Sequence, residues 1–238
     1  MKVALVILTR NERECVEVMF PRIPKPGPES GFDSVHVVDG GSTDGTVEYF
    51  VGQGITPLGQ SERGRGHAFL IAFQKIDADA YLFFSPDGNE NPLDLPKFRP
   101  LLESGADIVI ASRMMPASRN EEDDQFFRWR KWANQSFTLI ADVAFRRSGP
   151  FITDTINGYR AISRRAVDLL KLDASDYTIE YQMTIRAFKH RLRIEEFPTI
   201  EGNRIAGETQ ASSIVTGKRF LRALWREWSD KSTWPGQA

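Results

Sequence analysis

The chain has 238 residues, of which 41% are hydrophobic and 26% are charged, and its formal net charge is −1. This length allows one large α/β domain or two small ones, and the near-zero charge excludes a global attraction to nucleic acid. Its single cysteine excludes an internal disulfide framework, and its three histidines show no zinc-site spacing. We expect a cytoplasmic protein that does not cross a membrane by itself, because no stretch approaches about 18 uninterrupted apolar residues.

The first 115 residues alternate strand-like and helix-like segments. Largely apolar runs at residues 3–8, 35–38, 81–84 and 107–111 predict four strands, with helical patterns between them. Strands joined in this way predict a mostly parallel sheet, whose carboxyl edge gathers the polar residues that follow each strand. The usual phosphate-binding loop and the Gly-x-Gly-x-x-Gly pattern are both absent, so the chain is unlike the common nucleotide-binding folds.

The predicted strand at 81–84 ends in a polar corner at residues 85–92. Asp87 and Asn89 are alternate residues of an extended loop, so both can face one cation, while Gly88 permits the bend. These oxygens predict a site for a divalent metal and a diphosphate. The alternative is a turn that is simply rich in turn-forming residues.

Three further segments carry weaker signals. Gly-Arg-Gly at 64–66 precedes a predicted helix, although a loop tip would have the same composition. Basic, aromatic and apolar residues alternate through 125–147 and predict another helix. Residues 217–234 predict an amphipathic helix that could lie on a membrane surface, pack on the domain or form a homodimer.

Several motifs together resemble family 2 glycosyltransferases of the GT-A fold, and within them the dolichyl- and polyprenyl-phosphate sugar transferases such as dolichol-phosphate mannose synthase. The matching segments are 8–12, 37–46, 64–68, 85–89, 111–113, 154–161, Glu180 and 204–209. The resemblance implies an α/β sheet flanked by helices, a GT-A domain at 1–210 and a C-terminal helical extension at 211–238. Residues 1–115 would bind the nucleotide sugar, and residues 116–210 would form a helical acceptor side.

The resemblance also implies donor-side roles. Thr9, Asn11 and Glu12 would edge the nucleotide pocket, and Asp39 would accept a hydrogen bond from an imide N–H of uracil or guanine. The donor is accordingly expected to be GDP- or UDP-linked. Capping of the following turn is the alternative role for Asp39. Arg65 and Arg113 would complete the donor-binding set.

At the polar corner, the resemblance implies that Asp87 and Asn89 hold Mg²⁺ or Mn²⁺ against the donor diphosphate. Arg204 would meet the β-phosphate from a glycine-containing loop. Its alternative is a solvated surface arginine.

On the acceptor side, Arg130 and Asn134 would grip a lipid phosphate from one helical face, unless that helix is merely half-buried with snorkelling arginines. Asp154 would lie near the reacting oxygen and Arg160 would order it through a salt bridge, with Glu180 a weaker candidate of the same kind. Asp154 could be a base or a scaffold, because a phosphate acceptor is already anionic and needs no base.

Two positions depart from the family. Ser85 stands where the first carboxylate of Asp-x-Asp is usual, and Gly40 replaces a second carboxylate after Val38. We expect weaker metal binding without substrate, since Mg²⁺ commonly keeps waters and borrows phosphate oxygens.

The prediction is a metal-dependent inverting transfer from a nucleotide-diphosphate sugar to a polyprenyl phosphate, with peripheral contact at the inner face of the membrane. The alternatives are a soluble glycan or small alcohol acceptor, nucleotidyl transfer, and a catalytically degenerate sugar-nucleotide-binding protein.

Overall fold

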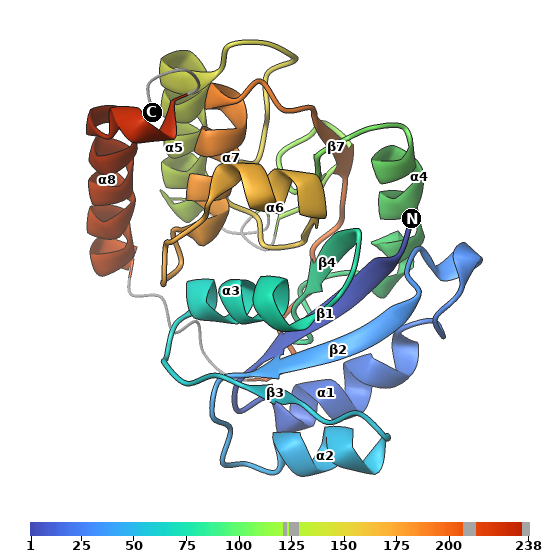
Figure 1. Cartoon of the computed structure of the whole chain (residues 1–238). Helices are drawn as coiled ribbons and strands as arrows, with labels where there is room; N and C mark the ends of the chain where they lie inside the picture. The colour runs from blue at the N-terminus through green and yellow to red at the C-terminus, as the bar shows by residue number, and fades with distance from the viewer. Residues whose placement is uncertain (121–122, 124–128, 207–212, 235–238) are drawn as a thin grey trace.

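The computed structural model describes residues 1–120, 123, 129–206 and 213–234. Within these ranges, seven strands form one sheet in the order β3-β2-β1-β4-β6-β5-β7 (Figure 1). Neighbouring strands are parallel except β6, which is antiparallel to both β4 and β5. The strands are β1 (Val3–Thr9), β2 (Ser34–Asp39), β3 (Leu58–Gly59), β4 (Ala80–Phe84), β5 (Ile108–Ser112), β6 (Arg160–Ser163) and β7 (Ile194–Pro198).

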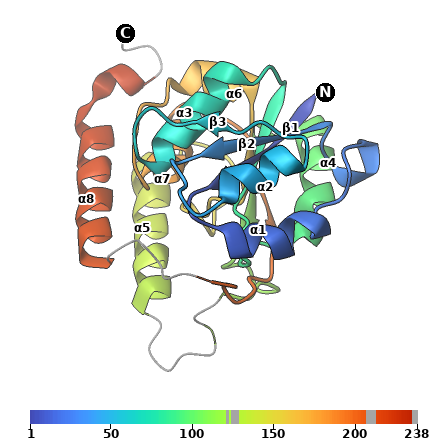
Figure 2. The same cartoon turned by 90° about the horizontal axis from the view of Figure 1, so that it is seen from below.

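Helices cover both faces of this sheet (Figures 1 and 2). The α-helices are α1 (Arg13–Met19), α2 (Thr46–Gly52), α3 (Arg65–Lys75), α4 (Phe98–Glu103), α5 (Trp129–Phe145), α6 (Arg164–Leu170), α7 (Ile179–Lys189) and α8 (Ser213–Ser229). Short 3₁₀ turns lie at η1 (Phe20–Arg22), η2 (Pro28–Ser30), η3 (Pro92–Lys97) and η4 (Lys231–Thr233). The predicted α/β fold with a mostly parallel sheet is confirmed.

Strand β1 is buried along its whole length because both of its faces meet a core. Val3, Leu5 and Ile7 join the cluster under α1, α2 and α4, whereas the alternate residues join the cluster under α3, α5, α6, α7 and α8. This two-sided burial explains why the strand reads as a continuous apolar run.

The sheet topology brings the polar segments to one edge. β1, β2, β4 and β5 are parallel, so the residues that follow each of them meet at their common carboxyl end. The antiparallel β6 begins at that same edge and therefore delivers the segment before it, residues 154–159, to the same place.

The two helices predicted in the second half are present where the structure describes them. α5 begins at Trp129, and the predicted residues 125–128 lie outside the described ranges. α8 covers residues 217–229 of the predicted amphipathic segment and lies beside α5 in both views. Within the described ranges, no helix combines the length and the apolarity needed to cross a membrane.

Candidate active site at the carboxyl edge of the sheet

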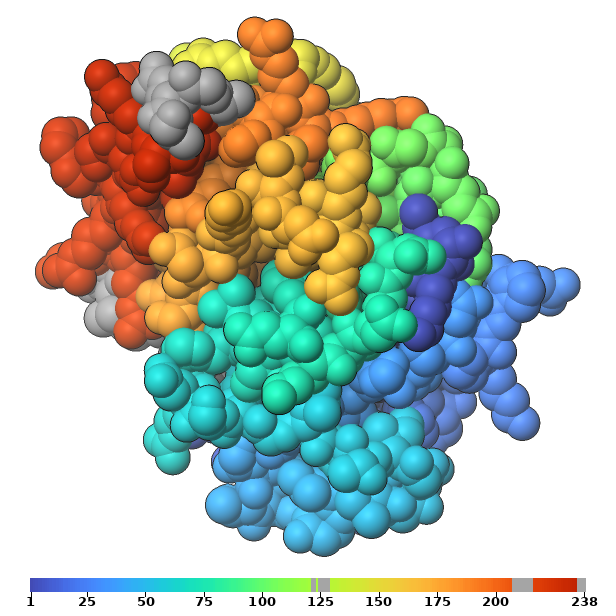
Figure 3. Space-filling model, in the orientation of Figure 1, coloured from blue at the N-terminus to red at the C-terminus, as the bar shows by residue number. Residues whose placement is uncertain are grey.

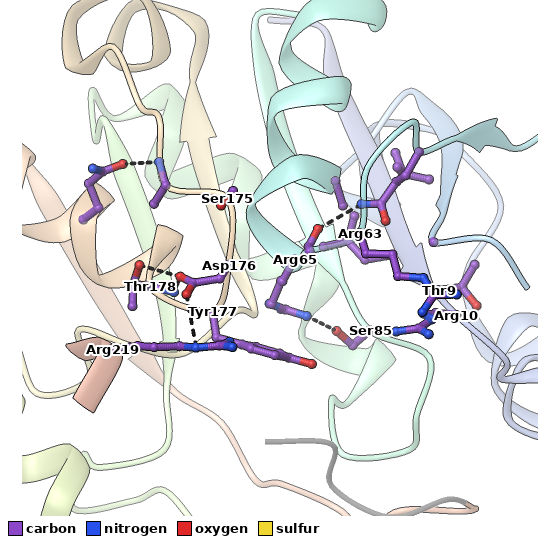
Figure 4. Close-up of a pocket in the computed structure, with 18 of the residues that line it drawn as sticks. Thr9, Arg10, Arg63, Arg65, Ser85, Ser175, Asp176, Tyr177, Thr178 and Arg219 are labelled. Carbon is purple, nitrogen blue, oxygen red and sulfur yellow. Dashed lines mark hydrogen bonds and ion pairs between the residues drawn. The ribbon is translucent and has the colours of Figure 1, made fainter. Parts of the chain in front are cut away.

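A cavity of about 960 Å³ opens at the carboxyl edge of the sheet and extends to α8. Six of the residues expected to bind the donor line it, which are Thr9, Asn11, Glu12, Arg65, Asp87 and Arg204. In Figure 4, the labelled residues Thr9, Arg10, Arg63, Arg65 and Ser85 lie on one side, and Asp176, Tyr177, Thr178 and Arg219 lie on the other.

The segment of residues 173–178 forms one wall of the cavity and lies between α3 and α8 (Figure 3). Gly66 approaches the carbonyl oxygen of Ala174 so closely that a Cβ would lie 2.0 Å from it, and a Cβ on Gly64 would lie 2.2 Å from that of Ser175. Gly-Arg-Gly at 64–66 is therefore not a loop tip, because it opens α3 and allows this backbone contact.

The Asp87 corner is occupied by the loop that carries Arg204. Arg204 Nη2 lies 3.0 Å from Asp87 Oδ2, and the backbone N–H of Ile205 donates to the Asp87 carbonyl at 2.9 Å. Gly88 has φ +100°, and a Cβ there would come within 2.7 Å of Ile205. The rest of the predicted loop, 207–209, lies outside the described ranges. Arg204 is thus an ion-pair partner of Asp87 rather than a solvated surface arginine.

Carboxylates crowd around Asp87. Burial, followed by the charge of Asp87, raises the pKa of Glu12 to about 8 and raises the pKa of Glu90 well above its ordinary value. A cation placed among these groups would relieve both effects. No cluster of three or more His, Cys, Asp or Glu side chains suited to a metal occurs in the described part of the chain. A divalent cation bound at Asp87 would therefore take most of its ligands from phosphate and water.

Arg65 contacts both Ser85, which departs from the pattern of the resembled family, and Glu180, which was expected on the acceptor side. Its Nε pairs with Glu180, and its Nη1 lies 3.4 Å from Ser85 Oγ. Burial lowers the pKa of Arg65, but the charge of Glu180 outweighs it and raises that pKa above the ordinary value. The backbone of Gly158 permits this placement, since a Cβ there would lie 1.9 Å from Arg65 Nη2. Glu180 is 3% exposed and committed to Arg65.

Asp154 is buried and pairs with Arg113, whose Nε lies 2.7 Å from Oδ2. This corrects the expected salt bridge between Asp154 and Arg160. Arg160 donates instead to the carbonyl oxygens of Thr155, Asn157 and Glu180 at 3.1, 2.6 and 3.0 Å. Its guanidinium therefore orders the backbone around Asp154 rather than the carboxylate itself.

Asp39 does not line the cavity. Its Oδ1 accepts from the backbone N–H groups of Gly41 and Ser42 at 2.9 and 2.8 Å, and its Oδ2 accepts from the Ser42 hydroxyl at 2.5 Å. The carboxylate thus caps the turn after β2, which is the alternative role that the sequence left open.

Arg130 and Asn134 also lie outside the cavity lining, near the N-terminal end of α5. One turn further along the helix, Thr138 hydrogen-bonds the hydroxyl of Thr155 at 2.8 Å, next to Asp154. The helix face carrying the expected phosphate ligands therefore runs toward the segment that holds Asp154.

The cavity contains further residues that the motifs did not identify. Arg219, Arg222 and Arg226 share one face of α8, and their spacing of three and four residues was visible in the sequence. Arg10 lies in the matching segment 8–12 but was assigned no role, and Gln60 and Arg63 belong to segments without a distinctive pattern. All of them line the cavity, as does Tyr177.

Comparison with known proteins identifies similar chains. Residues 5–169 match the family model described as glycosyl transferase family 2. An undecaprenyl-phosphate mannosyltransferase of Micrococcus luteus is 27% identical, with 99% of this chain and 97% of that protein covered. A dolichol-phosphate mannosyltransferase of Pyrococcus furiosus is 26% identical, with 95% of this chain but 63% of that protein covered.

A solved structure with a similar fold is glucosyl-3-phosphoglycerate synthase from Mycobacterium tuberculosis, in complex with Mn²⁺, UDP and phosphoglyceric acid. It superposes with a TM-score of 0.74 at 19% identity, and the match covers 97% of this chain and 80% of that one. At this identity the likeness concerns the fold.

Proposed function

The chain belongs to glycosyltransferase family 2, and we propose that it transfers a sugar with inversion from a nucleotide-diphosphate donor to a polyprenyl phosphate, using a divalent cation. The observation that carries the proposal is the convergence of Thr9, Asn11, Glu12, Asp87 and Arg204 on one cavity at the carboxyl edge of the sheet. The proposed catalytic domain covers residues 1–210, with its nucleotide-sugar half at 1–115, and residues 211–238 extend it.

The cation would be Mg²⁺ or Mn²⁺, held by Asp87 and Asn89. Bound there, it would stabilise the charge that develops on the leaving diphosphate. The Arg204 guanidinium forms an ion pair with Asp87. It therefore lies next to the proposed cation site, where it would add positive charge for binding the diphosphate. The solved neighbour with Mn²⁺ and UDP supports this assignment by analogy of fold.

The acceptor assignment draws on the names of the relatives, which act on undecaprenyl phosphate and dolichol phosphate. We assign the acceptor phosphate to Arg130 and Asn134 on α5. Because a phosphate nucleophile is already anionic, the reaction needs no general base. Asp154, paired with Arg113, then acts by positioning groups near the acceptor.

Peripheral contact with a membrane, at its inner face, is part of the proposal. α8 exposes Leu221, Trp225 and Trp228 by 55, 72 and 58% on the side away from its cavity-facing arginines. Exposed tryptophans beside basic residues suit the headgroup region of a bilayer. Association of two copies through the same surface is the competing arrangement.

The test is transfer from radiolabelled GDP- and UDP-sugars to polyprenyl phosphate in vesicles, with and without Mn²⁺. Asp87→Ala should lower the metal-dependent rate by roughly 10²–10³-fold, whereas the exposed Asp77→Ala control should retain it. Full metal-dependent transfer by Asp87→Ala would refute the Asp87 site. Transfer to a soluble glycan alone would change the acceptor class, and nucleotide binding without turnover would indicate a degenerate binding protein.

A further inference from the structure

We propose that Arg10 and Gln60, which line the cavity beside Gly40, recognise the base of the donor nucleotide. The expected ligand edge has a carbonyl oxygen beside a ring N–H, as guanine and uracil have. This inference rests on the proposed function and moves base recognition from Asp39 to two residues to which the sequence analysis assigned no role.

Arg10 follows Thr9 at the end of β1 and lines the cavity beside it (Figure 4). Within the described part of the chain, its Nε is buried and has no hydrogen-bond partner. A buried donor without a partner is costly in a folded protein, and a ligand at the same place removes that cost. We therefore expect an acceptor atom of a bound ligand to form the missing hydrogen bond with Arg10 Nε.

Gly40 lies directly beside Arg10 and Gln60. A Cβ on Gly40 would come within 3.1 Å of Arg10 Cδ and 3.1 Å of Gln60 Oε1, so a larger residue would require both side chains to shift by a few tenths of an ångström. A carboxylate at this position would in addition place a negative charge beside the guanidinium. With Gly40 at this position, Arg10 lines the cavity as a positively charged hydrogen-bond donor without an acidic side chain at residue 40.

Gln60 supplies the complementary acceptor. Its Nε2 donates to the carbonyl oxygen of Gly64 at 3.1 Å, and its Oε1, like Arg10 Cδ, lies beside Gly40. Arg10 can therefore donate to a carbonyl oxygen of a base while Gln60 accepts from a ring N–H. Asp39 is unsuited to this role, because its carboxylate holds the turn formed by Gly41 and Ser42.

The test is calorimetric binding of GDP, UDP, CDP and ADP in the presence of Mn²⁺. Wild type should bind GDP or UDP at least tenfold more tightly than CDP and ADP, and the two arms identify which base is used. Arg10→Ala and Gln60→Ala should each abolish this preference while leaving the weak binding of CDP and ADP unchanged. Gly40→Asp should have the same effect as Arg10→Ala, and Arg22→Ala, outside the cavity, should match wild type.

Thermal unfolding of each variant establishes that a loss of preference is not a loss of fold. If Arg10→Ala weakens all four nucleotides equally, Arg10 contacts the shared phosphates or ribose and the inference is wrong. It is also wrong if the preference persists in both alanine variants, although the proposed function then stands. If wild type binds none of the four, the proposed function fails with it.

Discussion

Arg113 grips both carboxylate oxygens of Asp154, with Nε 2.7 Å from Oδ2 and Nη2 3.0 Å from Oδ1. Burial acts to raise the pKa of Asp154, but the charge and hydrogen bonds of Arg113 outweigh it and hold that pKa below its ordinary value. A carboxylate stabilised in this way is a weak base. The pair therefore favours a positioning role for Asp154.

The Arg113–Asp154 pair predicts a large effect on stability. Arg113→Ala leaves Asp154 buried without a counter-charge and should lower the free energy of unfolding by about 3–5 kcal/mol. Arg113→Lys keeps the charge but loses the forked geometry, so it should lose less stability. Urea denaturation of the two variants measures both effects. Wild-type stability in Arg113→Ala would contradict the argument.

We expect the free energy of unfolding to depend on pH through Glu196. Its carboxylate accepts the backbone N–H groups of Thr153 and Asp154 at 2.7 and 2.9 Å, and burial raises its pKa to about 7 from an ordinary value of 4.5. The unfolded chain therefore releases this proton first as the pH rises. The stabilisation due to protonated Glu196 is complete below pH 4.5 and is lost by about pH 7.

Glu196→Gln removes this titration. The difference in unfolding free energy between the variant and wild type should shift in favour of the variant as the pH rises from 4.5 to about 7, and should level off above it. Chemical denaturation at several pH values measures the difference. A difference that stays constant across this range would show that Glu196 titrates normally.

Predictions from sequence succeeded where one local pattern carries the structure. Residues 3–8 are apolar throughout because β1 is buried on both faces, and Asp87 follows β4 at a sheet edge that strand alternation alone predicts. β6 was not predicted, because its four residues are too few for a periodic signal.

Partner choice within the site was not predictable in the same way. Arg113 and Arg160 both occur in motifs, yet which of them meets Asp154 depends on the pairing of β5 with the antiparallel β6. Base recognition was the predicted role of Asp39, and capping of the following turn was the alternative. The structure shows that the backbone N–H and the hydroxyl of Ser42, in the turn, donate to the Asp39 carboxylate.

Glu227 attaches α8 to α7. It is 1% exposed, and it accepts hydrogen bonds from Gln182, Arg186 and Lys189 of α7 at 3.1, 2.9 and 2.7 Å. Glu227→Ala leaves two buried cations without this partner and should cost about 3–5 kcal/mol of unfolding free energy. The exposed Glu103→Ala control should cost at most about 1 kcal/mol. Equal stability of the two variants would refute the anchoring role.

The exposed tryptophans of α8 predict binding to vesicles. Trp225→Ser with Trp228→Ser should reduce cosedimentation with anionic vesicles several-fold, because these side chains are 72 and 58% exposed and suit the bilayer interface. Val51→Ser, which removes an exposed apolar side chain from α2, should leave cosedimentation unchanged. If the double variant instead loses only self-association in sedimentation equilibrium, the surface joins two copies.

We expect alanine substitutions at two helical glycines, Gly66 and Gly217, to change the free energy of unfolding in opposite directions. Gly66→Ala places a methyl group 2.0 Å from the Ala174 carbonyl oxygen, so α3 and the segment of residues 173–178 must separate. The expected loss is about 1–3 kcal/mol of unfolding free energy, together with weaker nucleotide binding, since Arg65 begins the same helix. Gly217→Ala meets no atom within 4 Å inside α8 and should add roughly 0.5–1 kcal/mol.

Thermal unfolding and nucleotide titration of both glycine variants measure these effects. Because both changes add the same methyl group to a helix, propensity alone would stabilise both proteins. A destabilised Gly66→Ala beside a stabilised Gly217→Ala therefore isolates the backbone contact at Ala174. Stabilisation of both would mean that the wall of the cavity does not need this contact.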